Sequence, residues 1–157
     1  MKREDWLEQW GLSSLKLNLG FLQGDFTPKD PDRDAAWDLY VELLTRITTQ
    51  KLADSDGDEA TALESVHKIF GLTRDIMKQH KRCNEFAKIA IPVLNQVIRP
   101  FTARWHVASI RNGFIDPKVA SEFRTELAAL QVVLQKYSCA LSDMAGVEDL
   151  TELEDPS

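Results

Sequence analysis

The strongest chemical feature of this sequence is an arginine and a histidine near the end of a basic segment. Arg99 and His106 are separated by six residues. On a continuous α-helix, which turns by about 100° per residue, they lie close to one side. A guanidinium stabilises the negative charge of a phosphate, and an imidazole accepts or donates a proton near neutral pH. The pair could therefore bind an anion or take part in phosphodiester chemistry.

Lys81 and Lys88 extend this pair into a predicted basic stripe, because on an uninterrupted helix all these side chains fall within about 20° of one another. The surrounding segment 78–111 carries seven basic residues and one acidic residue, whereas 1–77 and 112–157 each carry a net charge of −6. The stripe could meet an external anion or acidic partner, pair with its own acidic flanks, or be the solvated face of a core helix.

The spacing of Arg99 and His106 resembles the motif of the HEPN family, in which an arginine precedes a histidine by a short spacer. The resemblance covers this spacing and the general helical character, and the position after the arginine, often polar in the family, is Pro100 here. HEPN proteins are helical bundles that usually dimerise and often cut RNA in toxin or antiviral-defence settings. The resemblance implies a metal-independent ribonuclease in which Arg99 stabilises phosphate charge and His106 handles a proton.

A structural role is the alternative for the same two residues. Arg99 would then cap a helix or pair with an acidic residue, and His106 would be half-buried. The spacing favours the structural role over a nuclease pair, because an unbroken helix places the two residues about 10 Å apart along its axis. That distance is too long for both side chains to grip one phosphate without a helix break or a second subunit.

The acidic stretch DSDGDEA at 54–60 has only part of a calcium-loop pattern. Glu59 stands where such a loop needs its turn glycine, and Ser65 stands where it needs a bidentate glutamate. The histidines lack metal-binding spacing, the two cysteines do not form a CxxC pair, and there is neither a glycine-rich phosphate loop nor a GxSxG motif. We therefore expect no metal, no cofactor and no nucleophilic catalysis.

The hydrophobic periodicity predicts an all-α fold, an antiparallel bundle of four main helices. The expected helices cover about 31–52, 58–80, 83–111 and 117–145, and we expect Pro92 and Pro100 to kink or interrupt the third. One predicted apolar stripe on the first helix consists of Trp37, Tyr40, Val41, Leu44, Ile47 and Thr48. Residues 1–146 form a single domain in this prediction, and 147–157 form an acidic flexible tail.

Helix ends are also predicted from the sequence. Asp30 and Asp116 are expected N-caps, with Pro31 and Pro117 at the first helical positions. Gly146 is the expected C-cap of the last helix.

The N-terminal region has the apolar residues typical of an interface. Trp6 and Trp10 share one face of a short predicted helix. An extended arm follows, in which large apolar residues alternate with small or polar ones. Its apolar members are Leu15, Leu17, Leu19 and Phe21. We expect the arm to pack on the bundle or on a second copy of the chain.

These features favour a non-enzymatic interaction module, an accessory subunit or adaptor, with bacterial stress or defence as one setting. The expected partner is another protein or a second copy in a homodimer, and the expected location is the cytoplasm, because the sequence shows neither a secretory signal nor a membrane span. The alternative is an RNA-binding or RNA-cleaving bundle that uses Arg99 and His106.

Overall fold

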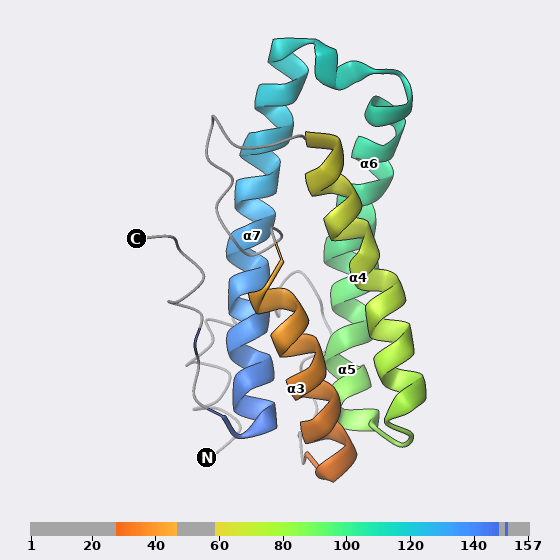
Figure 1. Ribbon diagram of the computed structural model, residues 1–157, viewed down its shortest axis with the longest axis vertical. Helices are drawn as coiled ribbons and strands as arrows, with labels where there is room; N and C mark the ends of the chain where they lie inside the picture. Colours follow the sequence, from red (N-terminus) through yellow and green to blue (C-terminus); the bar gives the residue numbers. More distant parts are fainter. Residues whose placement is uncertain (1–27, 47–58, 148–149, 151–157) are drawn as a thin grey trace.

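The computed structural model describes residues 28–46, 59–147 and 150. Within them the chain forms only helices (Figure 1). These are α3 (Asp30–Leu44), α4 (Glu59–Gln79), α5 (Asn84–Pro92), the π-helical segment η1 (Val93–Ile98), α6 (Arg99–Ile110), the 3-10 segment η2 (Gly113–Ile115) and α7 (Pro117–Ala145).

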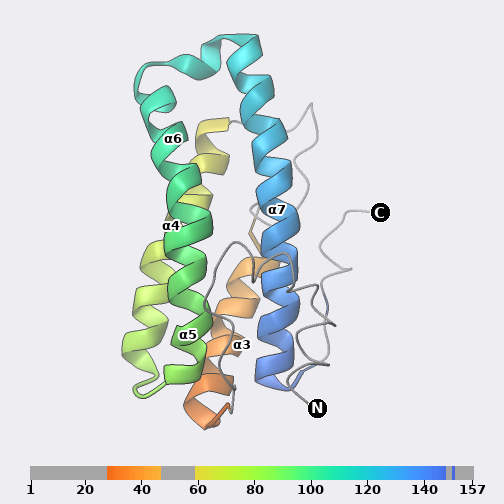
Figure 2. The ribbon, with the colours of Figure 1, turned by 180° about the vertical axis from the view of Figure 1, so that it is seen from behind.

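The helices form an antiparallel bundle, so the predicted all-α fold with four main helices is confirmed. The segments α5, η1 and α6 follow one another as a single rod, which runs back along α4 (Figure 1). The longest helix, α7, spans the whole bundle, whereas α3 covers only its lower half and packs mainly on α7 (Figure 2). The upper half therefore rests on α4, α6 and α7 among the described helices.

Asp32 connects the beginnings of two helices. Its carboxylate is 1% exposed and accepts hydrogen bonds from the backbone N–H of Lys29 at 2.9 Å and of Phe86 at 3.0 Å. The first bond closes the start of α3, and the second satisfies a free N–H in the first turn of α5, where the N-cap residue Cys83 makes no side-chain bond. One buried carboxylate therefore caps two helices.

The expected N-cap of α3 is wrong by one residue. The helix includes Asp30, its N-cap is Lys29, and Pro31 occupies the second helical position. The capping carboxylate comes instead from Asp32, where one oxygen accepts from Lys29 and the other accepts from Phe86 at the start of α5.

The apolar stripe predicted for the first helix is also partly wrong, and two of its members, Ile47 and Thr48, lie outside the described residues. Trp37 and Val41 are 45% and 38% exposed, whereas the buried face contains Ala35, Ala36, Leu39, Tyr40 and Leu43. The side of α3 that faces the core is therefore turned by about one residue from the prediction. Small residues on that side allow α3 to lie close to α7.

The two prolines of the third helix change its type rather than ending it. In a regular α-helix, Pro92 and Pro100 could not donate to the carbonyls four residues earlier. Between them lies η1, whose wider turns use a different hydrogen-bond register. Arg99, directly before a proline, still has helical angles (φ −59°, ψ −46°). The rod therefore continues, but η1 alters the rotation of α6 relative to α5.

The ends of α7 agree with the sequence prediction. Asp116 is the N-cap and accepts a hydrogen bond from the N–H of Lys118 at 2.9 Å, with Pro117 as the first helical residue. Gly146 ends the helix with φ 72° and ψ 33°, a left-handed conformation that glycine adopts without a Cβ penalty.

An aromatic cluster joins α6 to α7. The Trp105 ring meets Phe123 edge-on at 5.3 Å between centroids, and Phe114 lies 4.9 Å from Phe123. The indole N–H of Trp105 donates to Glu126 on α7 at 2.6 Å. These contacts hold one side of α6 against α7, so its opposite side faces α4.

Several predictions lie outside the described residues. The N-terminal helix and arm, with Trp6, Trp10, Leu15, Leu17, Leu19 and Phe21, are among them, as is most of the tail. Of the tail, the described Leu150 donates its backbone N–H to the hydroxyl of Tyr40 at 2.5 Å. None of the described helices has the length and hydrophobicity that a membrane span requires.

We expect Asp32→Ala to lower the free energy of unfolding by about 3 kcal/mol, because two backbone donors lose a charged acceptor in a buried site. Urea denaturation measures the change. Asp34→Ala is the matched control on the exposed side of the same helix, where we expect a change of at most about 0.5 kcal/mol. Equal effects of the two substitutions would contradict the double cap.

A pair of tyrosines allows a second comparison. The hydroxyl of the fully buried Tyr137 has no hydrogen-bond partner among the described residues, and burial raises the pKa of this phenol far above its usual value. Tyr137→Phe should leave stability unchanged or increase it by about 1 kcal/mol, whereas Tyr40→Phe should lower it by about 1 kcal/mol because the bond from Leu150 is lost. Thermal and urea unfolding of both variants test this, and a marked loss with Tyr137→Phe would reveal a partner for its hydroxyl.

Candidate anion-binding groove

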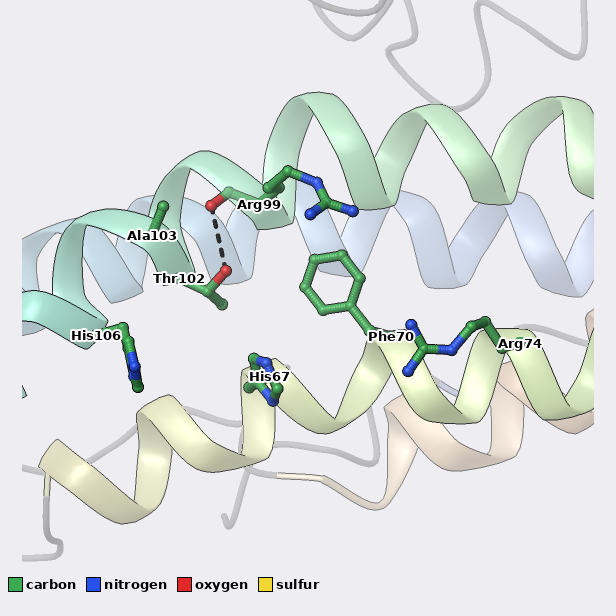
Figure 3. A pocket seen from close by; sticks show the side chains of 7 residues that line it. All are labelled: His67, Phe70, Arg74, Arg99, Thr102, Ala103 and His106. Carbon is green, nitrogen blue, oxygen red and sulfur yellow. Dashed lines mark hydrogen bonds between the residues drawn. The ribbon is translucent and has the colours of Figure 1, made fainter.

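A groove runs between α4 and α6 on the side of α6 that faces away from α7. It consists of two adjoining pockets of about 310 and 370 Å³, which share His67, Thr102 and His106. The first pocket is also lined by Phe70, Arg74, Arg99 and Ala103 (Figure 3). The second extends past Ala60, Leu63, Glu64 and Ser109.

Each helix supplies one arginine and one histidine to the groove. His67 and Arg74 are seven residues apart on α4, and Arg99 and His106 are seven apart on α6. Seven residues correspond to about 10 Å along a helix, so each pair lies on one side of its helix but far apart along it. Both guanidinium groups lie beside the Phe70 ring, and the histidines lie towards the other end (Figure 3). The groove thus has an arginine end and a histidine end.

Arg99 is held in place without an acidic partner. Its Nε and Nη2 donate to the Asn95 side-chain oxygen at 3.3 and 3.1 Å, and its guanidinium carbon lies 5.1 Å from the centre of the Phe70 ring. The cation–π contact and the two hydrogen bonds fix the plane of the guanidinium. Its remaining N–H groups are available at the groove.

Arg74 and Arg99 differ from the other arginines of the described helices. Arg33 pairs with Asp30, Arg104 with Glu126, and Arg124 with Glu59. Neither Arg74 nor Arg99 forms an ion pair with a described carboxylate, and neither has an acidic residue three or four positions away on its own helix. Two uncompensated positive charges therefore lie in one groove.

The histidine end has a different character. His67 and His106 are exposed, and the His67 ring lies 5.8 Å from Phe70. Glu64, which is 3.7 Å from the Lys68 ammonium, places a carboxylate beside this end, and Leu63 adds apolar surface. The positive charge is therefore concentrated at the arginine end.

The predicted basic stripe is not a continuous structural feature. Lys81 lies in the turn between α4 and α5, and Lys88 on α5 pairs with Glu85 at 2.8 Å. Only Arg99 and His106 of the stripe line the groove. Both side chains are exposed. The structural role considered from the sequence instead required a cap or an ion pair with an acidic residue for Arg99 and partial burial for His106.

Arg74 and His67 are not among the candidate site residues predicted from the sequence. They lie on a different helix from Arg99 and His106, so the spacing within the basic segment carries no information about them. One local signal was available for Arg74, because no acidic residue lies three or four positions from it on α4.

The lining of the first pocket includes two guanidinium groups, which can donate hydrogen bonds to an anion, and one hydroxyl, that of Thr102. The hydroxyl of Thr102 donates to the carbonyl of Arg99 at 3.2 Å, so its proton is already engaged. Among residues 28–46, 59–147 and 150, no group of three or more His, Cys, Asp and Glu side chains is placed to hold a metal ion.

Comparisons with known proteins give the chain no family. No protein-family model matches it, and neither a curated protein nor a solved structure does so. The class that can be stated is the all-helical bundle described above.

The stability of arginine variants should separate the groove arginines from a structural one. Arg74→Gln should change the free energy of unfolding by no more than about 0.5 kcal/mol, because no described ion pair is lost. Arg124→Gln should lower it by about 2 kcal/mol, because half-buried Glu59 loses the Nε donor at 2.8 Å. Urea denaturation tests the pair, and an equal loss in both would show that Arg74 has a structural partner.

Proposed function

We propose that this protein is a non-enzymatic interaction module, an accessory subunit or adaptor, that binds an anionic segment of a partner protein in the α4/α6 groove. The observation that carries the proposal is the pair of arginines, Arg74 and Arg99, which line one groove without an acidic partner among the described residues. Two positive charges that line one groove without a described carboxylate partner attract an anion to it.

The charge distribution supports a selective contact. The chain has a net charge of −6, so a polyanion is repelled by most of the molecule and attracted at the groove. Such local complementarity favours a short anionic segment in one orientation over a general acidic surface. Arginine is also among the residues that contribute most to binding energy in protein interfaces.

We propose the cytoplasm as the location. The two cysteines, Cys83 and Cys139, do not form a disulfide with each other, as is usual in a reducing compartment. Burial, with a smaller contribution from the Asp32 carboxylate, raises the pKa of the Cys83 thiol, which supports a packing role rather than a reactive one.

Cross-linking in cells tests the interaction. A photoreactive amino acid replaces the exposed groove residue Ala103 in the full chain, and adducts are identified by mass spectrometry. We expect a discrete adduct that disappears when Arg74→Glu and Arg99→Glu are added. Arg111→Glu with Lys118→Glu is the control, because it makes the same charge change on exposed residues that do not line the groove. Equal adducts in all variants, or none in the parent, would refute the groove interaction.

RNA cleavage is the second candidate function, and it is favoured by one observation: Arg99 and His106 line the same pocket. Their separation of about 10 Å along α6 argues for binding rather than cleavage by this pair. Purified protein is assayed on single-stranded and structured RNA beside Arg99→Ala and His106→Ala. We expect no cleavage. Cleavage that both substitutions abolish in folded protein would establish the nuclease.

A further inference from the structure

We infer that the anionic group bound at the arginine end of the groove is a single phosphate monoester, carried by a phosphorylated residue of the partner polypeptide. The inference rests on the proposed function and specifies its ligand. Its three supports are the charge at the arginine end, the available donors of Arg74 and Arg99, and the paired carboxylate of Glu64 at the histidine end.

The charge at the arginine end matches a phosphate better than a carboxylate. A phosphorylated side chain carries a charge of about −1.5 to −2 at neutral pH, whereas an aspartate or glutamate carries one negative charge. Arg74 and Arg99 together supply two positive charges beside the Phe70 ring (Figure 3). A carboxylate would leave one guanidinium uncompensated, and a phosphate dianion would neutralise both.

The donor geometry supports the same ligand. Asn95 engages the Nε and Nη2 edge of Arg99, and the Phe70 ring supports one face, so its Nη1 side is presented in a fixed orientation. Arg74 approaches from the other helix, and no described residue accepts a hydrogen bond from it. A phosphate monoester has three terminal oxygens and can accept from two guanidinium groups at once, which is the contact that arginine makes best.

The histidine end argues against a nucleic-acid backbone. A polyphosphate chain that followed the groove from Arg99 to His106 would meet the ion pair of Glu64 and Lys68 at the histidine end rather than further unpaired arginines. A peptide carries its phosphate at one position only. The Arg99 and His106 positions are about 10 Å apart along α6, a distance that about three residues of an extended peptide span. Leu63 and Glu64 at that position suit an apolar or basic side chain.

Matched peptide libraries test the inference on the full chain. One library has a fixed central phosphoserine, the second glutamate and the third serine, with the same random flanks. The best phosphopeptide and its two counterparts are then titrated by fluorescence anisotropy. We expect the phosphopeptide to bind roughly tenfold tighter than either counterpart, with a basic or apolar residue selected three positions away. Arg74→Gln and Arg99→Gln should each weaken it roughly tenfold.

Two controls test whether peptide binding depends on the groove and on the phosphate. Arg111→Gln removes an exposed charge outside the groove and should leave affinity unchanged, and inorganic phosphate should compete for the site. Equal binding of the three peptide forms, or tighter binding of a mixed-sequence single-stranded RNA than of the phosphopeptide, overturns the inference. If no phosphopeptide is preferred but cross-linking at Ala103 still depends on Arg74 and Arg99, the phosphate is wrong and the interaction function stands. If cross-linking at Ala103 does not depend on Arg74 and Arg99 either, the proposed interaction function is also contradicted.

Discussion

The buried carboxylate of Asp32 is the constraint on which much of the bundle depends. It accepts from Lys29 at the start of α3 and from Phe86 at the start of α5, so two helices begin at one side chain. A buried carboxylate is costly unless its oxygens are hydrogen-bonded, and here the helix starts supply the donors. The same bond places the rod of α5, η1 and α6 beside α3. The position of Arg99 therefore follows from an interaction at the other end of that rod.

The helix type of the rod changes before the residues that line the groove. Pro92 and Pro100 each remove one backbone donor, and η1 between them keeps the chain helical. The aromatic contacts of Trp105 and Phe123 hold one side of α6 on α7. With that side fixed, Arg99 and His106 point towards α4. The packing that buries the tryptophan is thus also the packing that opens a basic groove on the opposite side.

The two arginines of the groove differ from the other helical arginines in their partners. The helical arginines at 33, 104 and 124 pair with carboxylates, but Arg74 and Arg99 do not pair with any carboxylate that the structure describes. Proteins accept local electrostatic repulsion where binding later relieves it, and this combination of exposure, fixed geometry and missing counter-charge is typical of ligand sites. In the function that we propose, the acidic remainder of the chain limits anion binding to the groove. A small acidic protein can in this way select one anionic group without attracting polyanions in general.

The sequence by itself determined the features that depend on near neighbours along the chain. The helical periodicity, the Asp116 cap, the Gly146 end and the common side of Arg99 and His106 all follow from contacts within a few residues. The tertiary structure decided the rest. Asp32 caps a residue 54 positions away, and Arg74 and Arg99 line one pocket only because α4 packs on α6. Spacing along the chain wrongly predicted that Trp37 faces the core. It also wrongly placed Lys81 and Lys88 in one basic stripe with Arg99 and His106. The physical reason is that helix rotation is set by packing against other helices and by the π-helical turns, and neither is visible in the period of one segment.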